Sequence, residues 1–334
     1  MATIYDVSVM AGVSLATVSR VINKTGNVSE KTTQKVTQAM ERLGYRPNAI
    51  AQSLASNRSN SIGILIPELC GPFFGNLMAG AEKRLREANK HAIITAGHSK
   101  AETEKAGIEF LLSRNCDALI LHIDALSDQY LVDLAAQGKE IVVINRYVEP
   151  LKSRCIYLDN KTGGYLATKA MLDAGHSKIA YISGPTWKED ANQRLAGHHQ
   201  ALQEAGIADN PHLYVTGDFK QESGTAGLQT LLARDSDFTA LVCANDEMAS
   251  GAMAYARDIK LALPEQLSII GFDNIVYSSY LYPSLATVDY PVEEMAKMAA
   301  ALILKEVYQQ KGLQINNEFY PSIVMRDSLQ KRPS

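Results

Sequence analysis

The chain has 334 residues with a formal net charge of −3, and 46% of its residues are hydrophobic while 21% are charged. No apolar run reaches the roughly 20 residues that a membrane-spanning helix needs, and we expect no signal peptide. The four cysteines are dispersed singly, which indicates reduced thiols in a cytoplasmic protein rather than a disulfide framework or a zinc site. They are Cys70, Cys116, Cys155 and Cys243.

Basic side chains gather near the start of the chain. The first 60 residues contain seven basic and three acidic side chains, a net charge of +4, so the remaining residues carry −7. A basic head on an acidic body is typical of nucleic-acid contact confined to the head. A solvated helical face would give the same pattern, so charge alone leaves both interpretations open.

The same 60 residues predict three short helices. Thr3 followed three residues later by Asp6 has the form of a capping box that opens the first helix. Ser14 and Ser29 are suitable N-cap residues for the second and third helices, and the Ser14 hydroxyl is also placed to bind a DNA phosphate. Two glycines, Gly12 and Gly44, are expected to end the first and third helices.

The second predicted helix has one apolar and one polar face. Val18 and Ile22 lie four residues apart and share the buried stripe. The opposite face carries the N-terminal residues that a recognition helix presents to base edges in the major groove. These exposed residues are Leu15, Ala16, Ser19, Arg20 and Asn23.

The remaining 270 or so residues alternate apolar strands with amphipathic helices, which predicts an α/β body of about two domains' length. Continuous Ile/Val/Leu runs indicate parallel strands covered on both faces. A first set of strands is expected at 62–66, 92–95, 118–121 and 141–144, and a second set at 155–158, 179–182, 240–243 and 267–271. The stretch from Tyr147 to Arg154 is interpreted as a linker that crosses between the sets, and the residues from Pro291 onward as a return helix and strand.

Polar side chains follow several of these strands. His122, Asn145 with Arg146, Asn245 with Asp246, and Asp273 each come after a predicted strand. Ligands of open parallel sheets bind beyond the carboxyl ends of the strands, so these side chains are candidate ligand-binding groups. Each of two residues also has a purely structural interpretation. Asp273 could be a turn or cap residue, and His122 could simply occupy the end of a strand.

The chain lacks the motifs of an enzyme. It has no P-loop, no G-x-G-x-x-G after the first strand, no G-x-S-x-G and no Cys/His cluster with metal-ligand spacing. Asp246, Asp273 and His122 could imitate a catalytic set, but each has a binding role available. We therefore expect neither an enzyme nor a cofactor or metal site.

Together these motifs closely resemble the LacI/GalR family of bacterial transcriptional repressors over essentially the whole chain. The run from Gly12 to Val21 is similar to that family's recognition helix, and the run from Tyr45 to Ala55 to its hinge helix. The resemblance implies a small all-α helix-turn-helix head with a hinge helix, followed by an α/β periplasmic-binding-protein-like core of two Rossmann-like subdomains. The implied ranges are 1–58 for the head, with the hinge helix at about 48–56, and 59–334 for the effector-binding and dimerisation core. Within the core, the N-terminal subdomain is expected to cover about 60–158 plus 290–318. The C-terminal subdomain is expected to cover about 159–289 plus 319–334.

The resemblance also implies how the head binds DNA. Two hinge helices of a homodimer pair over the centre of a palindromic operator, and each inserts a leucine into the minor groove. The implied DNA-binding residues are Thr3, Ser14, Leu15, Ala16, Ser19, Arg20, Asn23, Asn48, Ala51 and Leu54. Leu15 and Ala16 favour a thymine methyl group or no base contact, and Arg20 suits either a guanine or a phosphate. Because a seven-residue hinge helix is too short to be stable alone, it can form on DNA and melt off it.

For the core, the resemblance implies a small-molecule effector held between the two subdomains. The candidate ligand-binding residues are Phe73, His122, Asn145, Arg146, Asp190, Arg194, Phe219, Asn245 and Asp273. Carboxylate, amide and guanidinium groups hold neighbouring hydroxyls, and an aromatic ring covers the apolar face of a pyranose, so the set suits a sugar. Because Asn145-Arg146 and the run from Pro72 to Gly75 resemble the galactose and β-glucoside regulators, a galactoside or β-glucoside is the expected effector, ahead of another sugar. A co-repressing nucleobase, as in the purine repressor, is the alternative, although that member has arginine and threonine at the positions of Lys188 and Asp190.

Three further expectations concern packing. Phe73 and Phe74 are adjacent in a helix, so only one is expected to face the cleft. The stripe of Leu77, Ala81, Arg84 and Leu85 is interpreted either as a dimer-forming surface or as a cover for the sheet. Trp187 is expected either to line the sugar site or to cap a loop.

Overall fold

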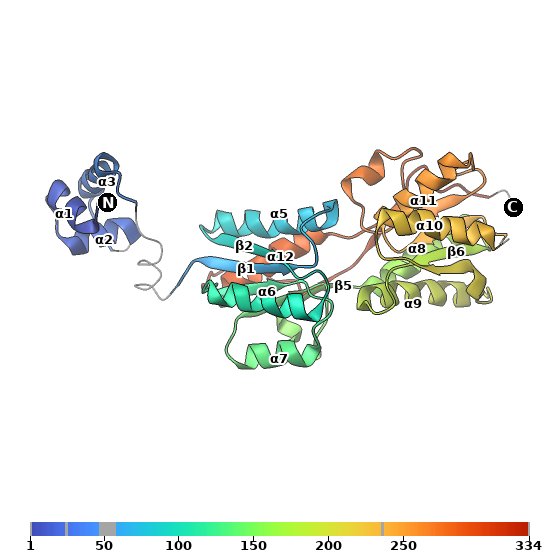
Figure 1. Ribbon diagram of the computed structural model, residues 1–334, viewed down its shortest axis with the longest axis horizontal. Coiled ribbons are helices and arrows are strands. Elements are labelled where there is room, and N and C mark those ends of the chain that lie inside the picture. Colours follow the sequence, from blue (N-terminus) through green and yellow to red (C-terminus); the bar gives the residue numbers. More distant parts are fainter. Residues whose placement is uncertain (1, 24–25, 47–57, 235–236, 333–334) are drawn as a thin grey trace. The chain divides into compact units, whose positions relative to one another are not determined.

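The computed structural model describes residues 2–23, 26–46, 58–234 and 237–332 (Figure 1). The chain divides into two compact units, Met1–Ser61 and Ile62–Ser334, which we call the head and the body. The predicted hinge residues Asn48, Ala51 and Leu54 lie outside the described residues. No single helix in the described ranges is long and apolar enough to cross a membrane, although the helices Ile4–Ala11 and Leu15–Asn23 together pass that test with a bend of 107° between them.

Three helices form the head: α1 (Ile4–Ala11), α2 (Leu15–Asn23) and α3 (Glu30–Leu43). The predicted capping box is confirmed, since the Thr3 hydroxyl accepts from the Asp6 backbone N–H and the Asp6 carboxylate accepts from the Thr3 backbone N–H. Ser29 caps α3 as predicted, and the two predicted stops, Gly12 and Gly44, adopt left-handed φ angles of 63° and 60°. The helices share a small apolar core of Val7, Ala11, Val18, Val36 and Ala39.

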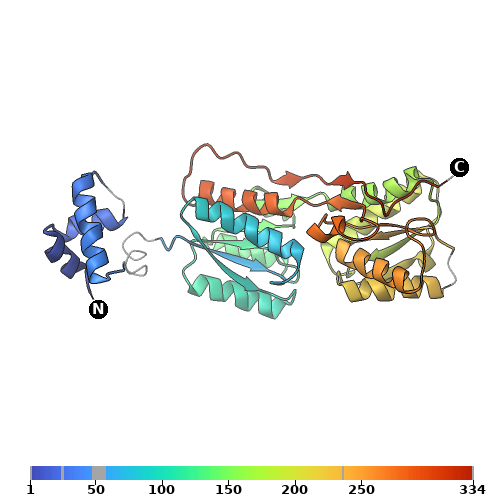
Figure 2. The ribbon, with the colours of Figure 1, turned by 90° about the horizontal axis from the view of Figure 1, so that it is seen from above.

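The first lobe of the body is built on a six-stranded sheet in the order β11-β5-β4-β3-β1-β2. Its strands are β1 (Ser61–Ile66), β2 (His91–Ala96), β3 (Ala118–Leu121), β4 (Ile141–Ile144), β5 (Cys155–Leu158) and β11 (Glu318–Phe319). The helices of this lobe are α5 (Pro72–Glu87), α6 (Ala101–Ser113), α7 (Asp128–Ala136) and α12 (Val292–Glu306). Figures 1 and 2 show α5 and α12 side by side on one face of the sheet, and α6 and α7 on the other. Two-sided coverage explains why the central strands are fully apolar.

The second lobe is built on a four-stranded parallel sheet in the order β7-β6-β8-β9. Its strands are β6 (Ile179–Ser183), β7 (Tyr214–Thr216), β8 (Ala240–Cys243) and β9 (Ser268–Ile270), and β10 (Thr287–Asp289) pairs antiparallel with β12 (Ser322–Val324). The helices are α8 (Asn160–Asp173), α9 (Glu189–Glu204), α10 (Gln221–Ala233) and α11 (Asp246–Asp258), with short 3₁₀ segments at Pro211–Leu213 and Val276–Ser279.

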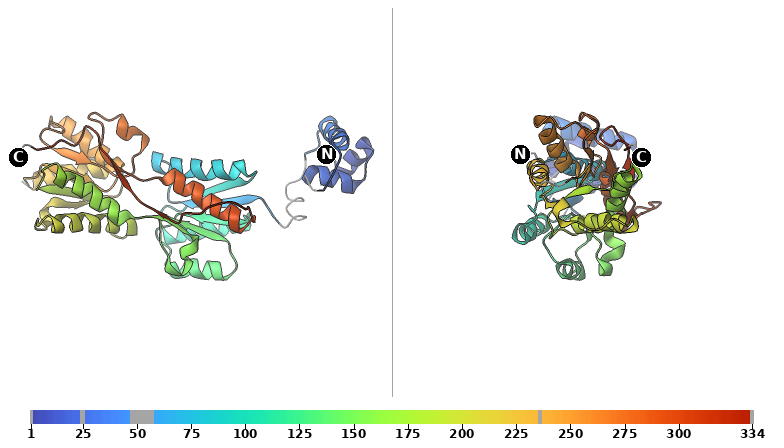
Figure 3. Two further views of the ribbon diagram at one scale, coloured as in Figure 1. Left: turned by 180° about the vertical axis from the view of Figure 1, so that it is seen from behind. Right: turned by 90° about the vertical axis from the view of Figure 1, so that its right-hand side faces the viewer.

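The chain passes between the lobes three times, as Figure 3 shows from behind. The crossings run from β5 to α8, from β10 to α12 and from β11 to β12. The predicted return helix and strand after Pro291 are therefore confirmed as α12 and β11. Several crossings make the two lobes a hinged pair rather than two tethered domains.

One predicted crossing was wrong. The stretch from Tyr147 to Arg154 contains a 3₁₀ segment, Glu149–Arg154, that connects two neighbouring strands of the same sheet. β5 was grouped with the second set of strands, although the implied range of about 60–158 includes it in the first subdomain. It pairs in parallel with β4 through Val143 and Cys155. The residue types of an apolar strand do not indicate which sheet it joins, because both sheets offer it equally apolar neighbours.

Close helix packing positions the start of α9. A Cβ atom on Gly164 of α8 would lie 1.9 Å from the Arg194 carbonyl oxygen, and one on Gly197 of α9 would lie 2.0 Å from the Lys161 carbonyl oxygen. Only glycine fits these two positions, so the backbones of α8 and α9 touch. The first turns of α9 are thereby fixed against α8.

Candidate functional site

The first candidate site is the exposed face of α2 in the head. The Ser14 hydroxyl accepts from the Thr17 backbone N–H at 3.2 Å, so Ser14 is the N-cap of this helix. Val18 is fully buried beneath the helix, whereas Leu15, Ala16 and Arg20 are exposed. Asn23 donates its amide to the Ser19 hydroxyl at 3.2 Å. The predicted buried stripe is confirmed at Val18, whereas Ile22 is only half-buried, and the exposed side chains stay candidates for major-groove contact.

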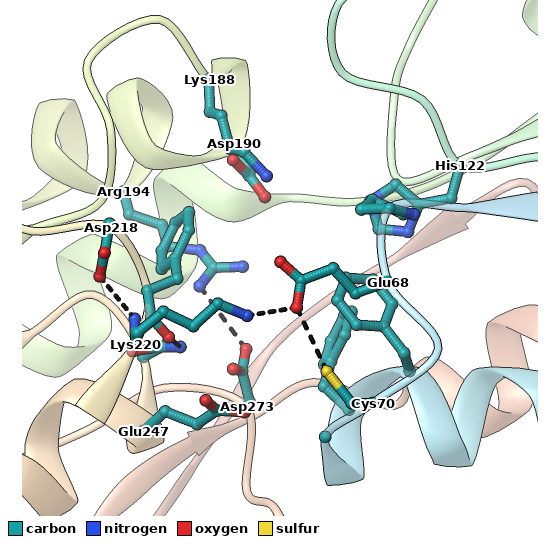
Figure 4. Close-up of a pocket in the computed structure, with 16 residues that line it drawn as sticks. Glu68, Cys70, His122, Lys188, Asp190, Arg194, Asp218, Lys220, Glu247 and Asp273 are labelled. Atoms are coloured by element: carbon teal, nitrogen blue, oxygen red, sulfur yellow. Dashed lines mark hydrogen bonds and ion pairs between the residues drawn. The ribbon is translucent and has the colours of Figure 1, made fainter. Parts of the chain in front are cut away.

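The second candidate site is a cavity of about 250 Å³ in the body. Its lining comes from the carboxyl ends of the strands and the starts of the following helices in both lobes, and Figure 4 shows the side chains converging on it. This is the position expected for a ligand of open parallel sheets. Predicted residues that line it are Phe73, His122, Asp190, Arg194, Phe219, Asn245 and Asp273.

Arg194 and Asp273 form a buried pair in the wall of the cavity (Figure 4). The two side chains are 3% and 8% exposed, and Arg194 Nη1 lies 3.5 Å from Asp273 Oδ1. Arg194 also donates to the Asn160 side chain at 2.9 Å and to the Ala244 carbonyl at 2.6 Å, and its guanidinium stacks 3.8 Å from the centre of the Phe272 ring. These contacts hold the guanidinium in one place.

Asp273 is poised to bind a hydrogen-bond donor. Its Oδ1 atom is buried yet accepts no hydrogen bond from the described residues. Burial raises the pKa of this carboxyl well above its usual range, and the nearby Arg194 only partly offsets the effect. Its φ of 109° lies in the left-handed region, which costs on the order of 1–3 kcal/mol for a non-glycine residue. An unsatisfied acceptor held in a strained position is best explained by a ligand group that completes it.

Aromatic rings form the apolar part of the cavity wall. The Phe219 ring lies against Gly184, where a Cβ atom would come within 2.2 Å of the ring, so only glycine leaves room for it. The rings of Phe73 and Phe74 meet edge to face at 5.3 Å, and both line the cavity. The expectation that only one of these two faces the cleft was wrong. They occupy the first turn of α5, where the helix end itself points into the cavity, so neighbouring positions both reach it.

His122 and Asn145 belong to a polar network at one side of the cavity. The amide of Asn145 lies 3.4 Å from His122 Nε2 and 3.2 Å from Asp190 Oδ2, and its oxygen accepts from the Tyr290 hydroxyl. His122 is 5% exposed, its Nδ1 has no partner among the described residues, and burial lowers its pKa. A neutral imidazole with one nitrogen unused is suited to a hydroxyl ligand.

Two predicted ligand residues have other partners. Both polar atoms of the Asn245 side chain are used, because its oxygen caps α11 at the Met248 N–H and its amide donates to the Phe219 carbonyl at 2.9 Å. Asn245 therefore positions the Phe219 segment as well as lining the cavity. Arg146 does not line it: it donates to the Leu126 carbonyl at 2.8 Å and pairs with Asp128 at 2.7 Å. It borders a separate surface hollow together with Asn145, so its predicted role in the cleft is not supported.

Two ion pairs join the lobes beside the cavity. Lys188 of the second lobe reaches Asp124 of the first at 2.7 Å, and both side chains are at most 15% exposed. Lys220 likewise pairs with Glu68 across the cleft (Figure 4). Four further residues line the cavity without having been predicted from the sequence: Glu68, Asp218, Lys220 and Glu247. The available signal was position, since each follows closely after the carboxyl end of a strand.

Two family models match the chain. The model for bacterial regulatory proteins of the lacI family matches residues 3–48, and a periplasmic binding protein-like domain matches residues 168–329. The transcriptional regulator GalR of Escherichia coli (strain K12) is 38% identical over 329 residues, which cover 98% of this chain and 96% of GalR. The chain belongs to the LacI family.

Other members of the LacI family are also similar to this chain over nearly its whole length. The transcriptional repressor PurR of Aliivibrio salmonicida is 34% identical over 99% of this chain and 100% of PurR. A crystal structure of the lac repressor dimer bound to operator and the anti-inducer ONPF is 28% identical, covers 98% of this chain and 99% of its own, and superposes with a TM-score of 0.86. The chain is thus a DNA-binding transcriptional repressor, and the predicted helix-turn-helix head and periplasmic-binding-protein-like core are confirmed.

Two open questions of packing are also settled in this LacI-family structure. Leu77, Ala81 and Leu85 are fully buried in the body's own core, so the α5 stripe covers the sheet and is not a free dimer surface. Trp187 is 56% exposed and does not line the cavity; its ring lies beside the Lys188 ammonium group at 5.4 Å. It is a loop residue at the edge of the cleft.

Proposed function

We propose that this repressor binds a palindromic operator as a homodimer and is released by a sugar, with a galactoside or β-glucoside as the effector. The observation that carries the sugar assignment is the cavity's combination of a buried Arg194–Asp273 pair with the Phe219 ring. A carboxylate and a guanidinium together bind adjacent hydroxyls, and a ring packs on the apolar face of a pyranose. The volume of about 250 Å³ favours a ligand the size of a monosaccharide.

The second candidate is a nucleobase that acts as co-repressor. The aromatic walls would stack on a flat base, and the PurR relative matches this chain along its whole length. Lys188 argues against it, because the ammonium group of this cavity-lining lysine is already paired with Asp124 at 2.7 Å. We therefore rank the sugar first.

Effector and operator are coupled through movement of the lobes. In this proposal the sugar contacts residues of both lobes and closes the cleft. Closure shifts the lobes relative to the partner subunit, and this shift moves the hinge helices out of register with the operator. A coupling free energy of about 1–3 kcal/mol is typical of such linkage, and it acts equally on both affinities. Operator release by the sugar and weaker sugar binding on the operator are then two measures of one quantity.

An exposed apolar cluster on the second lobe supports the homodimer. Val276, Tyr280 and Tyr282 are 61%, 80% and 98% exposed and lie within seven residues of each other. Burying such side chains in a subunit contact would remove a large apolar area from water. Sedimentation of the Tyr280→Ser and Tyr282→Ser double variant tests this: a shift from dimer to monomer at micromolar concentration supports the surface, and an unchanged dimer rejects it. We further propose a cytoplasmic location, where operator DNA is accessible.

The test of function is fluorescence anisotropy of the full-length protein on a labelled palindromic operator from beside its own gene. Galactose, β-glucosides and hypoxanthine are titrated at fixed salt, because phosphate contacts make DNA affinity salt-dependent. We expect one of the sugars to abolish operator binding by the parent protein. The Asp273→Asn variant should stay bound to the operator when it is titrated with the same sugar. Tighter binding with hypoxanthine would overturn the sugar assignment in favour of the co-repressor.

A further inference from the structure

The cationic side chains that line the cavity are all paired with carboxylates. The pairs are Arg194 with Asp273, Lys188 with Asp124, and Lys220 with Glu68. In the last pair, burial on its own raises the pKa of Glu68, but the Lys220 ammonium lowers it below its usual range. The cavity therefore presents no cation without a partner to an incoming ligand.

Carboxylates are in excess around the same cavity. Beyond the paired groups, Asp190, Asp218 and Glu247 also line it. Asp190 accepts from the Ala191 N–H and the Asn145 amide, whereas the Glu247 side chain has neither a hydrogen bond nor an ion pair among residues 58–234 and 237–332. Burial raises the pKa of Glu247, and the nearby Lys220 ammonium, which is already paired with Glu68, offsets only part of the rise.

Helix N-termini beside the cavity would ordinarily attract anions. Here α9 and α11 carry their own carboxylates in the first turn, at Asp190 and Glu247. In α5 the first turn contains Phe73 and Phe74, whose rings line the cavity. The helix ends are therefore already balanced by negative charge or covered by apolar rings.

We propose that the effector cavity selects sugars by charge, accepting an uncharged sugar or an amino sugar and rejecting sugar phosphates and sugar acids. This rests on the sugar effector proposed above. A phosphate would have to separate Lys220 from Glu68 and leave that carboxylate unpaired beside it, close to Glu247. The effector is then a free sugar, supplied by uptake or by hydrolysis of a glycoside and not by a phosphoryl-transfer step.

A set of ligands that differ only at C6 tests the proposal on the full-length protein. Galactose and glucose are each compared with the 6-amino-6-deoxy sugar, the uronate and the 6-phosphate by isothermal titration at physiological salt. The uronate and the 6-phosphate should bind about 100-fold more weakly than the parent sugar, the factor for two unit charges roughly 6 Å apart at an effective dielectric constant of about 20. The amino sugar should bind at least as tightly as the parent.

Two variants test whether charge is the cause. Glu68→Gln removes the carboxylate that pairs with Lys220, and Glu247→Gln removes a carboxylate that has no ion pair. Each variant should reduce the ratio of affinities between the parent sugar and its 6-phosphate, here called the gap, at least tenfold. Glu265→Gln is the matched control, since Glu265 is exposed in the loop before β9, at the opposite end of the strand from the cavity. It should leave the gap unchanged.

The outcomes separate this proposal from the proposed function. If a 6-phosphate or uronate binds as tightly as its parent, charge selection is wrong while the sugar-responsive repressor stands. If the amino sugar is excluded as strongly as the uronate, the selection is by shape and the proposal is again wrong. If hypoxanthine binds and none of the parent sugars does, the proposed function itself fails, and this inference fails with it.

Discussion

Replacing Asp246 by asparagine should change how the stability of the body depends on pH. Asp246 is the first residue of α11 and is completely buried. Its carboxylate accepts from the Thr287 hydroxyl at 2.6 Å, the Ser278 hydroxyl at 2.6 Å and the Ile275 backbone N–H at 3.0 Å. It therefore ties α11 to the segment that follows the cavity residue Asp273.

The magnitude follows from the raised pKa of Asp246. Burial raises this pKa from 3.8 to about 6, and the hydrogen bonds from Ser278 and Thr287 only partly oppose the shift. As the pH rises from about 4 to about 6, the unfolded chain releases a proton that the folded chain retains, so the free energy of unfolding falls. A shift of about two pKa units corresponds to about 3 kcal/mol, lost through this window and constant on either side of it.

Urea unfolding followed by the fluorescence of Trp187, the single tryptophan, measures the effect in the lobe that contains Asp246. An amide does not titrate, so the free energy of unfolding of Asp246→Asn should not fall with this carboxyl group. Between about pH 4 and about pH 7.5, the variant's free energy of unfolding should therefore rise by about 3 kcal/mol relative to that of the parent protein. Ser278→Ala removes a donor to the carboxylate and should extend the pH-dependent window upward. A constant difference between Asp246→Asn and the parent protein across this range would refute the reasoning.

Other predictions concern the two binding functions. Arg20→Ala should weaken operator binding by about 1–3 kcal/mol if Arg20 reads a base, with discrimination lost at one operator position; an equal loss on all sequences in a binding-site library would identify a phosphate contact. Leu54→Ala should weaken operator binding in the anisotropy assay while leaving the sugar affinity from titration calorimetry unchanged. Asp273→Ala should abolish the sugar response and spare repression, and a retained response would show that the cavity is misassigned. Lys188→Met leaves the half-buried Asp124 with the Ser99 hydroxyl but without its ammonium partner, and should destabilise the body by up to about 3 kcal/mol, measured by thermal unfolding. A change below about 1 kcal/mol would show that the pair is dispensable.

Local signals in the sequence predicted the helices of the head and the central strands of both sheets, but not the short strands β7 and β10. Thr3, Ser29, Gly12 and Gly44 each marked a helix end that the structure contains. These signals are reliable because a cap satisfies backbone groups within a few residues of itself. The strands were predictable for a related reason, since burial on both faces leaves a run of apolar residues.

Which strand joins which sheet was not predictable in the same way. β5 was grouped with the wrong sheet because its residues would pack equally well in either one. The Phe73 and Phe74 error has a similar origin: helical periodicity describes the middle of a helix, but these residues occupy its first turn, where the direction of the helix end decides what they face. Both errors concern geometry that arises only when distant segments meet.

The same limit applies to the specificity of the cavity. The resemblance to the LacI/GalR family predicted the effector contacts at Arg194, Asp273 and the aromatic rings, and their residue types suit a sugar; most of these side chains do meet. What residue types did not show is that Lys188 and Lys220 are already neutralised by carboxylates of the other lobe. Lys188 and Asp124 are 64 positions apart, and no periodicity connects them. Free lysines at these two positions would make the cavity attract phosphates, whereas paired lysines make it repel them. The choice between a sugar and its phosphate therefore depends on how the charged side chains pair across the cleft, which a list of the lining residues does not show.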